Sequence, residues 1–469
     1  MLIFSFFCVY YNFLNNSSLQ THTQTPYHET EKPTPHPQEP TITQSPQKQK
    51  PTQTPHPQEP TITQSPQKQK PTQTPHLGHL RKVDLEVIVD EKLSTLPIVN
   101  NRINAKFMTR YWDQDILKDQ IEVCNVGGEK YQLNMSMHHQ DSDAHIQAYY
   151  DSDIVDRYVR WLDTPNVPKV LLNPESFAKS RCAKHHKCVS RFNWVVSTAI
   201  GDDAVWPYFS PLAIKSNFFN KPLSDFQKIV MNPKLEFRKE DKREYESNSS
   251  NTEPYQPALA SWFASNCDFL YSNRKFYIQE MMNHMKIDSY GPCLNTRHLK
   301  DDDRTKLNEK IKTITKYKFY LSFENSYCRG YITEKPYQCL QNNVVPVLMV
   351  HPDNLKLMPR GSYIYVGHYK SPKELAEYLI KLENDDKEYQ KYFAWRNDPA
   401  ILQEWYDNSM AVFGDTSIKC KIVELYIKWI KEGAWTLPKS YPLKNACLHA
   451  DFFDSVSTPS FLDENKIKE

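Results

Sequence analysis

The pattern of apolar and polar residues predicts alternating strands and helices over most of the chain. Short apolar runs rich in aromatic and β-branched residues predict strands at 83–90, 167–176, 191–199, 257–265, 286–291, 318–323 and 344–350. Apolar residues at helical spacing predict helices at 273–285, 333–343 and 371–385. Strands that alternate with helices favour parallel sheets with helices on both faces, so we expect the α/β fold class.

The predicted helix at 333–343 begins with an unusual charge. Thr333 is a suitable N-cap and Pro336 is tolerated in the first turn, but Lys335 lies in that turn as well. A helix N-terminus carries partial positive charge, so a cation there is disfavoured. We therefore expect an anion beside Lys335, at the strand ends where parallel sheets bind ligands.

The N-terminal 80 residues differ from the rest of the chain. Residues 1–14 are apolar, lack a basic flank and are shorter than the roughly 18 residues of a membrane span, so they fit a signal peptide, a truncated signal anchor or an incomplete gene model. Residues 15–80 are predicted to be a low-complexity stem, in which residues 35–54 recur unchanged at 55–74. Pro, Thr, Gln and Lys cannot form a core, so a disordered spacer or a plain disordered tail is expected.

The length of the rest of the chain indicates how many domains it forms. About 390 residues are too many for one ordinary core, so we expect two domains, at 81–255 and 256–440, followed by a C-terminal tail at 441–469. The charged residues 239–254 fit a surface loop or a linker between the two domains.

Charge and cysteine content narrow the function further. The net charge of +2 argues against a nucleic-acid partner. Ten cysteines without a CxxC pair argue against structural zinc and favour disulfides in an oxidising lumen, and Cys182 and Cys188 are close enough to pair. The nine cysteines beyond Cys8 are an odd number, so at least one thiol should stay free or pair with another chain. Asn-x-Ser/Thr sequons, which agree with a secretory route, stand at Asn15, Asn16, Asn134 and Asn248.

The motif FENS…GYITEK…VPV, within residues 320–349, resembles the donor-binding signature of the α1,3/4-fucosyltransferases. Residues 261–291 and 361–396 resemble the stretches that flank this signature in that family. LLNPES (171–176), FNWVVS…PY (192–208) and MHHQD (137–141) resemble its acceptor-side segments. The resemblance covers about residues 85–400.

The resemblance implies two Rossmann-like domains that face a cleft, the GT-B type, with the acceptor held by residues 81–255 and GDP-fucose by 256–440. It implies an inverting transfer of L-fucose to O3 of N-acetylglucosamine in a protein- or lipid-linked glycan. The expected location is the Golgi membrane, as a type II protein with a lumenal catalytic domain, or a secreted form. The alternatives are a different donor or acceptor, and a catalytically silent protein that binds nucleotides or glycans.

The resemblance assigns a role to each candidate site residue. Glu175 would be the catalytic base, although a loop glutamate that caps the next turn is the plain alternative and Asp202 and Asp203 are rival carboxylates. Arg274 and Lys335 would hold the diphosphate. The residues expected to hold the nucleoside are Asn325, Tyr331 and Glu334, and those expected on the acceptor side are His138 and His139.

No obligatory metal cofactor is expected, and Mn²⁺ would at most stimulate the reaction. The acidic runs at 141–143, 151–153 and 301–303 are interpreted as loops. Lys335, Arg274 and the helix N-terminus would take the role of a metal at the diphosphate. The chain also departs from the family pattern. STAIGDD (197–203) lacks two basic side chains, Arg329–Gly330 replaces an acidic residue, Pro336 replaces a large apolar one and Val350 replaces a glycine, which predicts altered specificity or weakened activity.

Overall fold

The computed structural model describes residue 98 and residues 100–453, apart from 110–120, 138–143, 155–166, 220–223, 249, 268–270, 299–306 and 434–444. The apolar segment 1–14, the stem 15–80 and the predicted strand 83–90 therefore lie outside the described residues. Both sheets of the structure belong to one compact unit, Leu93–Glu469.

The first sheet has seven strands in the order β2-β3-β1-β4-β5-β6-β7, and only the hairpin pair β2–β3 is antiparallel. The strands are β1 (Arg102–Phe107), β2 (Ile121–Val126), β3 (Glu129–Met137), β4 (Ile146–Tyr150), β5 (Lys169–Asn173), β6 (Trp194–Ser197) and β7 (Ala204–Val205). Every residue of β4, β5 and β6 is buried, as expected for parallel strands covered on both faces.

The second sheet has five parallel strands in the order β12-β11-β10-β8-β9. They are β8 (Ala260–Phe263), β9 (Ile287–Tyr290), β10 (Phe319–Phe323), β11 (Val345–Met349) and β12 (Ile364–Tyr365). The predicted strands from residue 257 onward are confirmed, and so is the α/β class with two largely parallel sheets.

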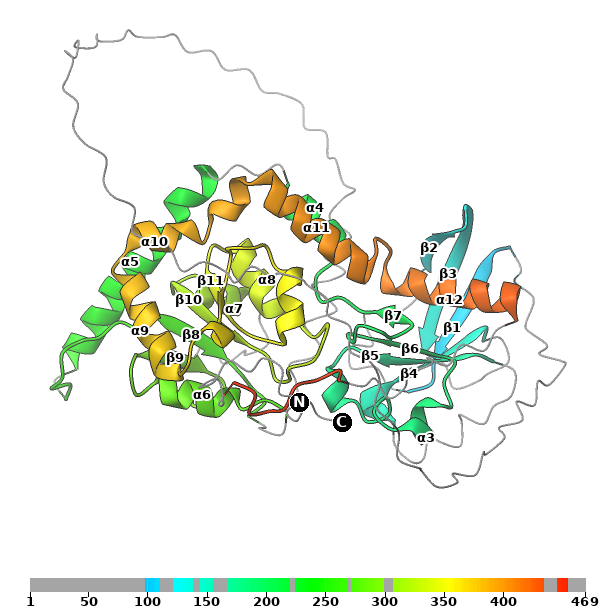
Figure 1. Cartoon of the computed structure of the whole chain (residues 1–469), viewed down its shortest axis with the longest axis horizontal. Helices are drawn as coiled ribbons and strands as arrows, with labels where there is room; N and C mark the ends of the chain where they lie inside the picture. Colours follow the sequence, from blue (N-terminus) through cyan, green and yellow to red (C-terminus); the bar gives the residue numbers. More distant parts are fainter. Residues whose placement is uncertain are drawn as a thin grey trace, which may run out of the picture. The chain divides into compact units, whose positions relative to one another are not determined.

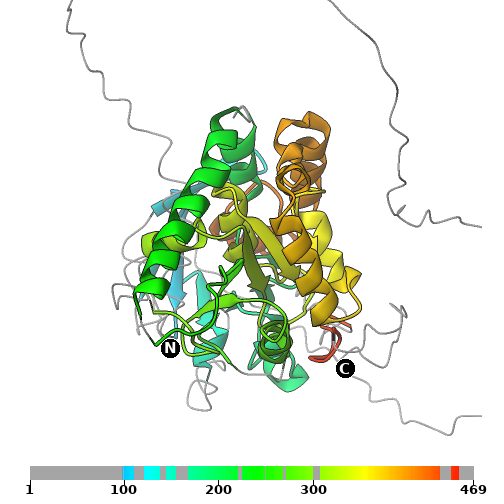
Figure 2. The ribbon, with the colours of Figure 1, turned by 90° about the vertical axis from the view of Figure 1, so that its left-hand side faces the viewer.

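Helices and short 3₁₀ turns connect the strands. The helices are α3 (His186–Val189), α4 (Pro211–Phe218), α5 (Ser224–Ser247), α6 (Arg274–Met281), α7 (Leu307–Ile314), α8 (Glu334–Gln341), α9 (Pro372–Glu383), α10 (Asp386–Lys391), α11 (Pro399–Phe413) and α12 (Ile418–Glu432). The 3₁₀ turns are η1 (Asp151–Asp153), η3 (Phe177–Lys179), η4 (Pro352–Leu357), η5 (Val366–His368) and η6 (Ala394–Asn397). Figure 2 shows α5, in green, and α9, in gold, flanking the strands of the second sheet.

Local sequence accounts for the helices that border the candidate site. Helix α9 begins where the Ser371 hydroxyl accepts a hydrogen bond from the Glu374 amide, as the sequence predicts. Helix α8 begins after Thr333, with Pro336 in its first turn, but the Thr333 side chain makes no capping bond. Its hydroxyl bonds elsewhere, and this difference reveals part of the site.

Helix α12 lies across the first sheet although it follows the second sheet in the chain (Figure 1). Its apolar residues, among them Val423, Tyr426 and Trp429, share a core with strands β1 to β6. The disulfide Cys124–Cys420 joins it to β2. Helix α12 lies within the predicted segment 256–440 but packs on the sheet of the segment 81–255. The domain boundary between residues 255 and 256 stays a prediction.

The prediction of a loop over residues 239–254 is wrong for its first part, because α5 continues to Ser247. The charged stretch is helical since its side chains find partners at helical spacing or in the core. Lys242 and Glu246 pair at i and i+4, 3.6 Å apart. Asp241 is buried and forms an ion pair with Arg297.

Candidate functional site

Glu324 is the buried centre of the candidate site, and sequence reasoning missed it. It follows the carboxyl end of β10 and has no exposed surface. Its carboxylate accepts hydrogen bonds from the Thr333 amide (2.8 Å), the Thr333 hydroxyl (2.6 Å) and Lys335 Nζ (2.6 Å). Glu324 therefore fixes the start of α8 against the end of β10. The available signal was a carboxylate directly after a predicted strand, at the edge where ligands bind.

Lys335 has a protein anion beside it. The expectation that an anion offsets this lysine is met in the structure by Glu324, while the diphosphate remains a prediction. The Lys335 side chain keeps 14% of its surface exposed. Its ammonium also contacts the Thr333 hydroxyl at 2.7 Å. The lysine is thus held in a fixed position with part of its surface open to a ligand.

Glu334 offers a buried carboxylate oxygen that is still available as an acceptor. Its Oε1 lies 3.3 Å from Lys310 Nζ, and among the described residues no group donates a hydrogen bond to its Oε2. Burial acts to raise the pKa of Glu334, but Lys335 and Lys310 outweigh it, so the pKa is lowered and the group stays ionised. An unpaired buried acceptor is costly, which favours a ligand hydroxyl as its partner.

The backbone of Glu175 is held by its neighbours in the first sheet. Glu175 lies two residues beyond the carboxyl end of β5. Its amide donates to Asn173 Oδ1 at 3.1 Å, and its carbonyl accepts from the Thr198 hydroxyl at 3.0 Å. The half-buried side chain takes no part in these backbone bonds, and its catalytic role stays a prediction.

Tyr331 connects the candidate base to the signature motif. Its hydroxyl donates to Glu175 Oε2 at 3.0 Å. Burial raises the pKa of Glu175, and Lys179, the Tyr331 bond and Lys335 oppose this rise in that order. A carboxylate with a raised pKa takes a proton more readily, as a general base must. Because the Tyr331 side chain is only 2% exposed, packing in the protein is its observed role, and contact with a nucleotide stays a prediction.

Arg274 is more deeply buried than a phosphate clamp requires. Its guanidinium donates to the backbone carbonyls of Phe323 (2.7 Å) and Asn266 (2.8 Å) and lies over the Trp262 ring. Burial lowers the pKa of Arg274, and the nearby Glu324 opposes this. The arginine stands at the start of α6, as predicted, but contact with a diphosphate would need it to exchange these carbonyl bonds, so the clamp role stays a prediction.

The remaining predicted site residues are less informative. Asn325 Oδ1 accepts a hydrogen bond from the Ser326 hydroxyl at 3.2 Å, and Ser326 accepts one from Ser176, so the two strand-end loops meet here. His138 and His139 lie outside the described residues. The rival carboxylate Asp203 accepts from the Val195 amide and Asp202 pairs with a serine hydroxyl. Burial raises the pKa of Asp203 to about 6, but its carboxylate is bonded to the backbone of β6 within the first sheet.

Two departures from the family pattern touch each other. Gly330 has a φ of +80°, and a Cβ on it would lie 2.1 Å from the Thr198 carbonyl oxygen and 3.0 Å from Ile200 Cγ1. Any side chain at 330 would therefore collide with the STAIGDD segment. The glycine in the signature and the altered acceptor-side segment form one close backbone contact in this chain.

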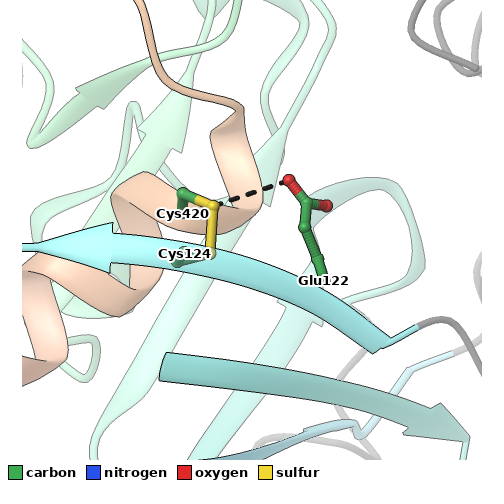
Figure 3. A group of neighbouring side chains, drawn as sticks. All are labelled: Glu122, Cys124 and Cys420. Carbon is green, nitrogen blue, oxygen red and sulfur yellow. Dashed lines mark hydrogen bonds between the residues drawn. A yellow bond between two sulfur atoms is a disulfide. The ribbon is translucent and has the colours of Figure 1, made fainter. Parts of the chain in front are cut away.

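Cysteine pairs and acidic groups explain the apparent metal clusters. Cys182 and Cys188 are joined, as predicted, and further disulfides link Cys267 with Cys293 and Cys328 with Cys447. Figure 3 shows Glu122 beside the sulfurs of Cys124 and Cys420, but those sulfurs form a disulfide. The thiol of Cys339 is free and buried. Zinc binds a thiolate and not a disulfide, so the group of Glu122, Cys124 and Cys420 is structural.

The acidic run at 151–153 is also structural. Asp151 is buried and accepts hydrogen bonds from the Ser180 hydroxyl and from the amides of Arg181 and Cys182. These bonds close the loop after β5. The runs at 141–143 and 301–303 lie outside the described residues, so the structure does not test them.

The pH dependence of folding should reveal His351, which supports the site. His351 is the N-cap of η4, and its Nδ1 accepts a hydrogen bond from the Asp353 amide (3.1 Å). Asn354 of η4 in turn accepts a hydrogen bond from the Gly330 amide. Burial lowers the pKa of His351 to about 4, with Arg329 adding to this and Asp353 opposing it. Since the unfolded pKa is about 6.5, the unfolded state binds more protons between these values, and stability should fall by about 2–3 kcal/mol as pH drops from 7 to 4.

The matched variant is His351→Asn, which keeps a capping acceptor and loses the titration. Denaturant unfolding at pH 7 and pH 4 measures the effect. We expect the acid-side loss of unfolding free energy to be about 2 kcal/mol smaller in the variant than in the parent. An equal loss in both proteins would show that His351 does not titrate in this way.

The structure defines an α/β protein whose candidate site residues gather after the carboxyl ends of parallel strands, next to the start of α8. Residues 254–428 match the model of the family described as glycosyltransferase family 10 (fucosyltransferase), C-terminal part. This part of the chain is therefore similar to glycosyltransferase family 10.

Curated fucosyltransferases are similar to the chain over part of their length. The chain is 38% identical over 150 residues to glycoprotein 3-alpha-L-fucosyltransferase A of Drosophila melanogaster, which is 31% of this chain and 29% of that protein. It is 41% identical over 135 residues to GDP-fucose protein O-fucosyltransferase 3 of Danio rerio, which is 28% of this chain and 30% of that protein. The match thus spans about three tenths of each relative.

A solved α1,3-fucosyltransferase with GDP-fucose is 18% identical to the chain, with a TM-score of 0.41 over 72% of this chain and 92% of the other. Among the described residues, no helix is both long and apolar enough to pass through a membrane.

Proposed function

We propose that this chain is an inverting fucosyltransferase that moves L-fucose from GDP-fucose to O3 of N-acetylglucosamine in a protein- or lipid-linked glycan. The observation that carries the proposal is the 3.0 Å hydrogen bond from Tyr331 to Glu175. It brings the candidate base of the first sheet to the signature motif of the second. The match to the fucosyltransferase family model over residues 254–428 supports GDP-fucose as the donor.

In this mechanism Glu175 takes the proton from the acceptor hydroxyl as that oxygen attacks the anomeric carbon of fucose. The bond from this carbon to the GDP oxygen breaks on the opposite face, which inverts the configuration. Negative charge grows on the diphosphate, and Lys335 and the N-terminus of α8 stabilise it. Glu334 Oε2, which lacks a donor among the described residues, accepts a hydrogen bond from a ribose hydroxyl.

A protein acceptor is the second candidate, and one comparison favours it. The Danio rerio relative, 41% identical over the matched stretch, is named a protein O-fucosyltransferase. In that case a serine or threonine hydroxyl would replace the sugar hydroxyl before Glu175. The close contact of Gly330 with Thr198 lies in the acceptor-side segment that departs from the family pattern, which supports an acceptor other than a common glycan.

Transfer of labelled fucose from GDP-fucose tests both candidates. The full chain is incubated with lactosamine, chitobiose-core and LacdiNAc acceptors and, separately, with folded protein acceptors. Label on O3 of N-acetylglucosamine supports the first candidate, and label on serine or threonine supports the second. GDP-fucose binding without transfer to any of these would favour the silent binder.

We further propose that the enzyme works in an oxidising lumen, either anchored in the Golgi membrane through its N-terminus or secreted. The support is the set of four disulfides in the structure, which persist in such compartments. Separation of cell membranes from the medium, followed by detection of the chain in each fraction, tests this location.

Metal removal should leave most of the activity. Lys335 and the start of α8 supply the positive charge that Mn²⁺ provides elsewhere, so we propose that no metal is obligatory. Initial rates are compared after dialysis against EDTA and after addition of Mn²⁺. We expect more than about half of the rate to survive EDTA. In an enzyme that depends on a metal, the ion stabilises charge by several kcal/mol, so its removal would instead abolish measurable turnover. Complete loss that Mn²⁺ restores would contradict the proposal.

A further inference from the structure

Residues 445–453, called here the C-terminal strap, are attached to the signature motif although the predicted tail was given no role. The disulfide Cys328–Cys447 joins the strap to residues 324–331, called here the signature loop. The two partners are 119 residues apart in the sequence. The strap therefore crosses back to the strand end where the candidate donor residues lie.

Backbone hydrogen bonds continue the attachment on both sides of this disulfide. The Arg329 amide donates to the Ala446 carbonyl at 2.8 Å, and the Leu448 amide donates to the Tyr327 carbonyl at 2.9 Å. These bonds form a short antiparallel bridge. The strap thus holds the backbone of the signature loop between Tyr327 and Arg329.

The strap also holds the start of α6. The Asn273 amide, which directly precedes Arg274, donates to the Ala450 carbonyl at 3.1 Å. Tyr327 reaches the same place, because its hydroxyl donates to Asn273 Oδ1 at 2.9 Å. In Figure 1 the strap is the red segment beside α6. One short segment therefore bonds both elements that carry candidate phosphate or nucleoside residues.

Apolar contacts fasten the end of the strap. Phe453 is 2% exposed and packs edge-on against Tyr327, with ring centres 4.9 Å apart, and against Tyr365 of β12 at 6.0 Å. At the other end, Ala446 and Cys447 belong to the same buried cluster as Tyr331, the partner of Glu175. Ordering of the strap is thereby coupled to the placement of Tyr331.

We propose that the C-terminal strap is a positioning element of the nucleoside diphosphate site. It keeps the signature loop and the start of α6 at one fixed spacing, so that the site need not be ordered when the ligand binds. Preorganised sites bind more tightly because the ordering cost falls on folding rather than on binding. The ligand class in this inference rests on the proposed function, while the positioning itself does not.

The test compares two disulfide deletions in the full chain. Cys328→Ser with Cys447→Ser removes the strap link, and Cys124→Ser with Cys420→Ser removes a matched long-range link between β2 and α12. GDP affinity is measured by calorimetry, and hydrogen exchange is followed in peptides that cover 324–333 and 272–281. We expect about tenfold weaker GDP binding and faster exchange of both peptides for the first pair alone.

A second comparison avoids the cysteines. Phe453→Ala removes the ring that packs on Tyr327, and Phe453→Leu keeps apolar volume there. We expect Ala to reproduce the loss of GDP affinity and Leu to recover much of it. This pair decides the matter if the cysteine variants do not fold.

The outcomes separate this inference from the proposed function. If the parent binds GDP and both strap variants bind it equally well, the strap is no positioning element and the proposed function stands. If the parent does not bind GDP, the proposed function fails, and exchange alone decides. Faster exchange of both peptides then upholds the positioning, and unchanged exchange overturns it.

Discussion

Replacement of Glu175 by Gln should lower fucose transfer by about 10²-fold or more while GDP affinity stays unchanged. Gln keeps an oxygen that accepts the hydrogen bond from Tyr331, so the local structure should persist. It cannot accept a proton from the acceptor hydroxyl, which is the step assigned to the base. The rate is measured as turnover of labelled GDP-fucose at saturating acceptor, and affinity by calorimetry with GDP.

Two features make this result specific. Asp202→Asn and Asp203→Asn, at the rival carboxylates, should retain transfer because these groups bond within the first sheet. The parent rate should also fall on the acid side at a pH above the ordinary range of a glutamate, because burial raises the pKa of Glu175. Transfer that survives in Glu175→Gln would assign the base to another residue.

Replacement of Lys335 by Met should weaken GDP binding by about 10- to 100-fold, as expected for a charged partner of a phosphate. The single variant should also unfold more easily. It leaves the carboxylate of Glu324, which has no exposed surface, without its cation, and broken buried pairs cost about 3–5 kcal/mol. The loss of affinity and the loss of stability must therefore be separated.

The double variant Lys335→Met with Glu324→Gln separates them. Gln still accepts from Thr333 and carries no charge, so stability should recover while GDP affinity stays low. Lys373→Met is the matched control, because Lys373 is the second residue of α9 as Lys335 is of α8, and its side chain is 61% exposed. Unchanged GDP affinity in the double variant would exclude Lys335 from the site.

The strands and helices around the signature could be predicted because their periodicity is strong and their ends are marked. Strands β8, β10 and β11 and helices α6, α8 and α9 lie within the segments expected from sequence. The helical part of 239–247 was not predicted, since its charged residues resemble a loop until Asp241 is seen to pair with Arg297. The position of α12 was not predictable either, because local pattern does not say which sheet a helix covers.

The candidate site was predictable in its parts and not in its connections. The resemblance named Glu175, Tyr331 and Lys335 singly, whereas their contacts depend on how the two sheets meet. Glu324 was missed because its role rests on Thr333 and Lys335, nine and eleven positions further along the chain. The partner of Cys328 was not predictable, since many pairings are open to nine cysteines and connectivity cannot be read from spacing.

The most direct test of the proposed activity is release of the nucleoside diphosphate by the full chain: GDP from GDP-fucose, compared with GDP from GDP-mannose and UDP from UDP-galactose, in the presence of a pool of glycan and protein acceptors. The account predicts acceptor-dependent release from GDP-fucose alone, and its loss in Glu175→Gln. Release from another donor at an equal or higher rate, or release from GDP-fucose that persists in Glu175→Gln, would contradict it.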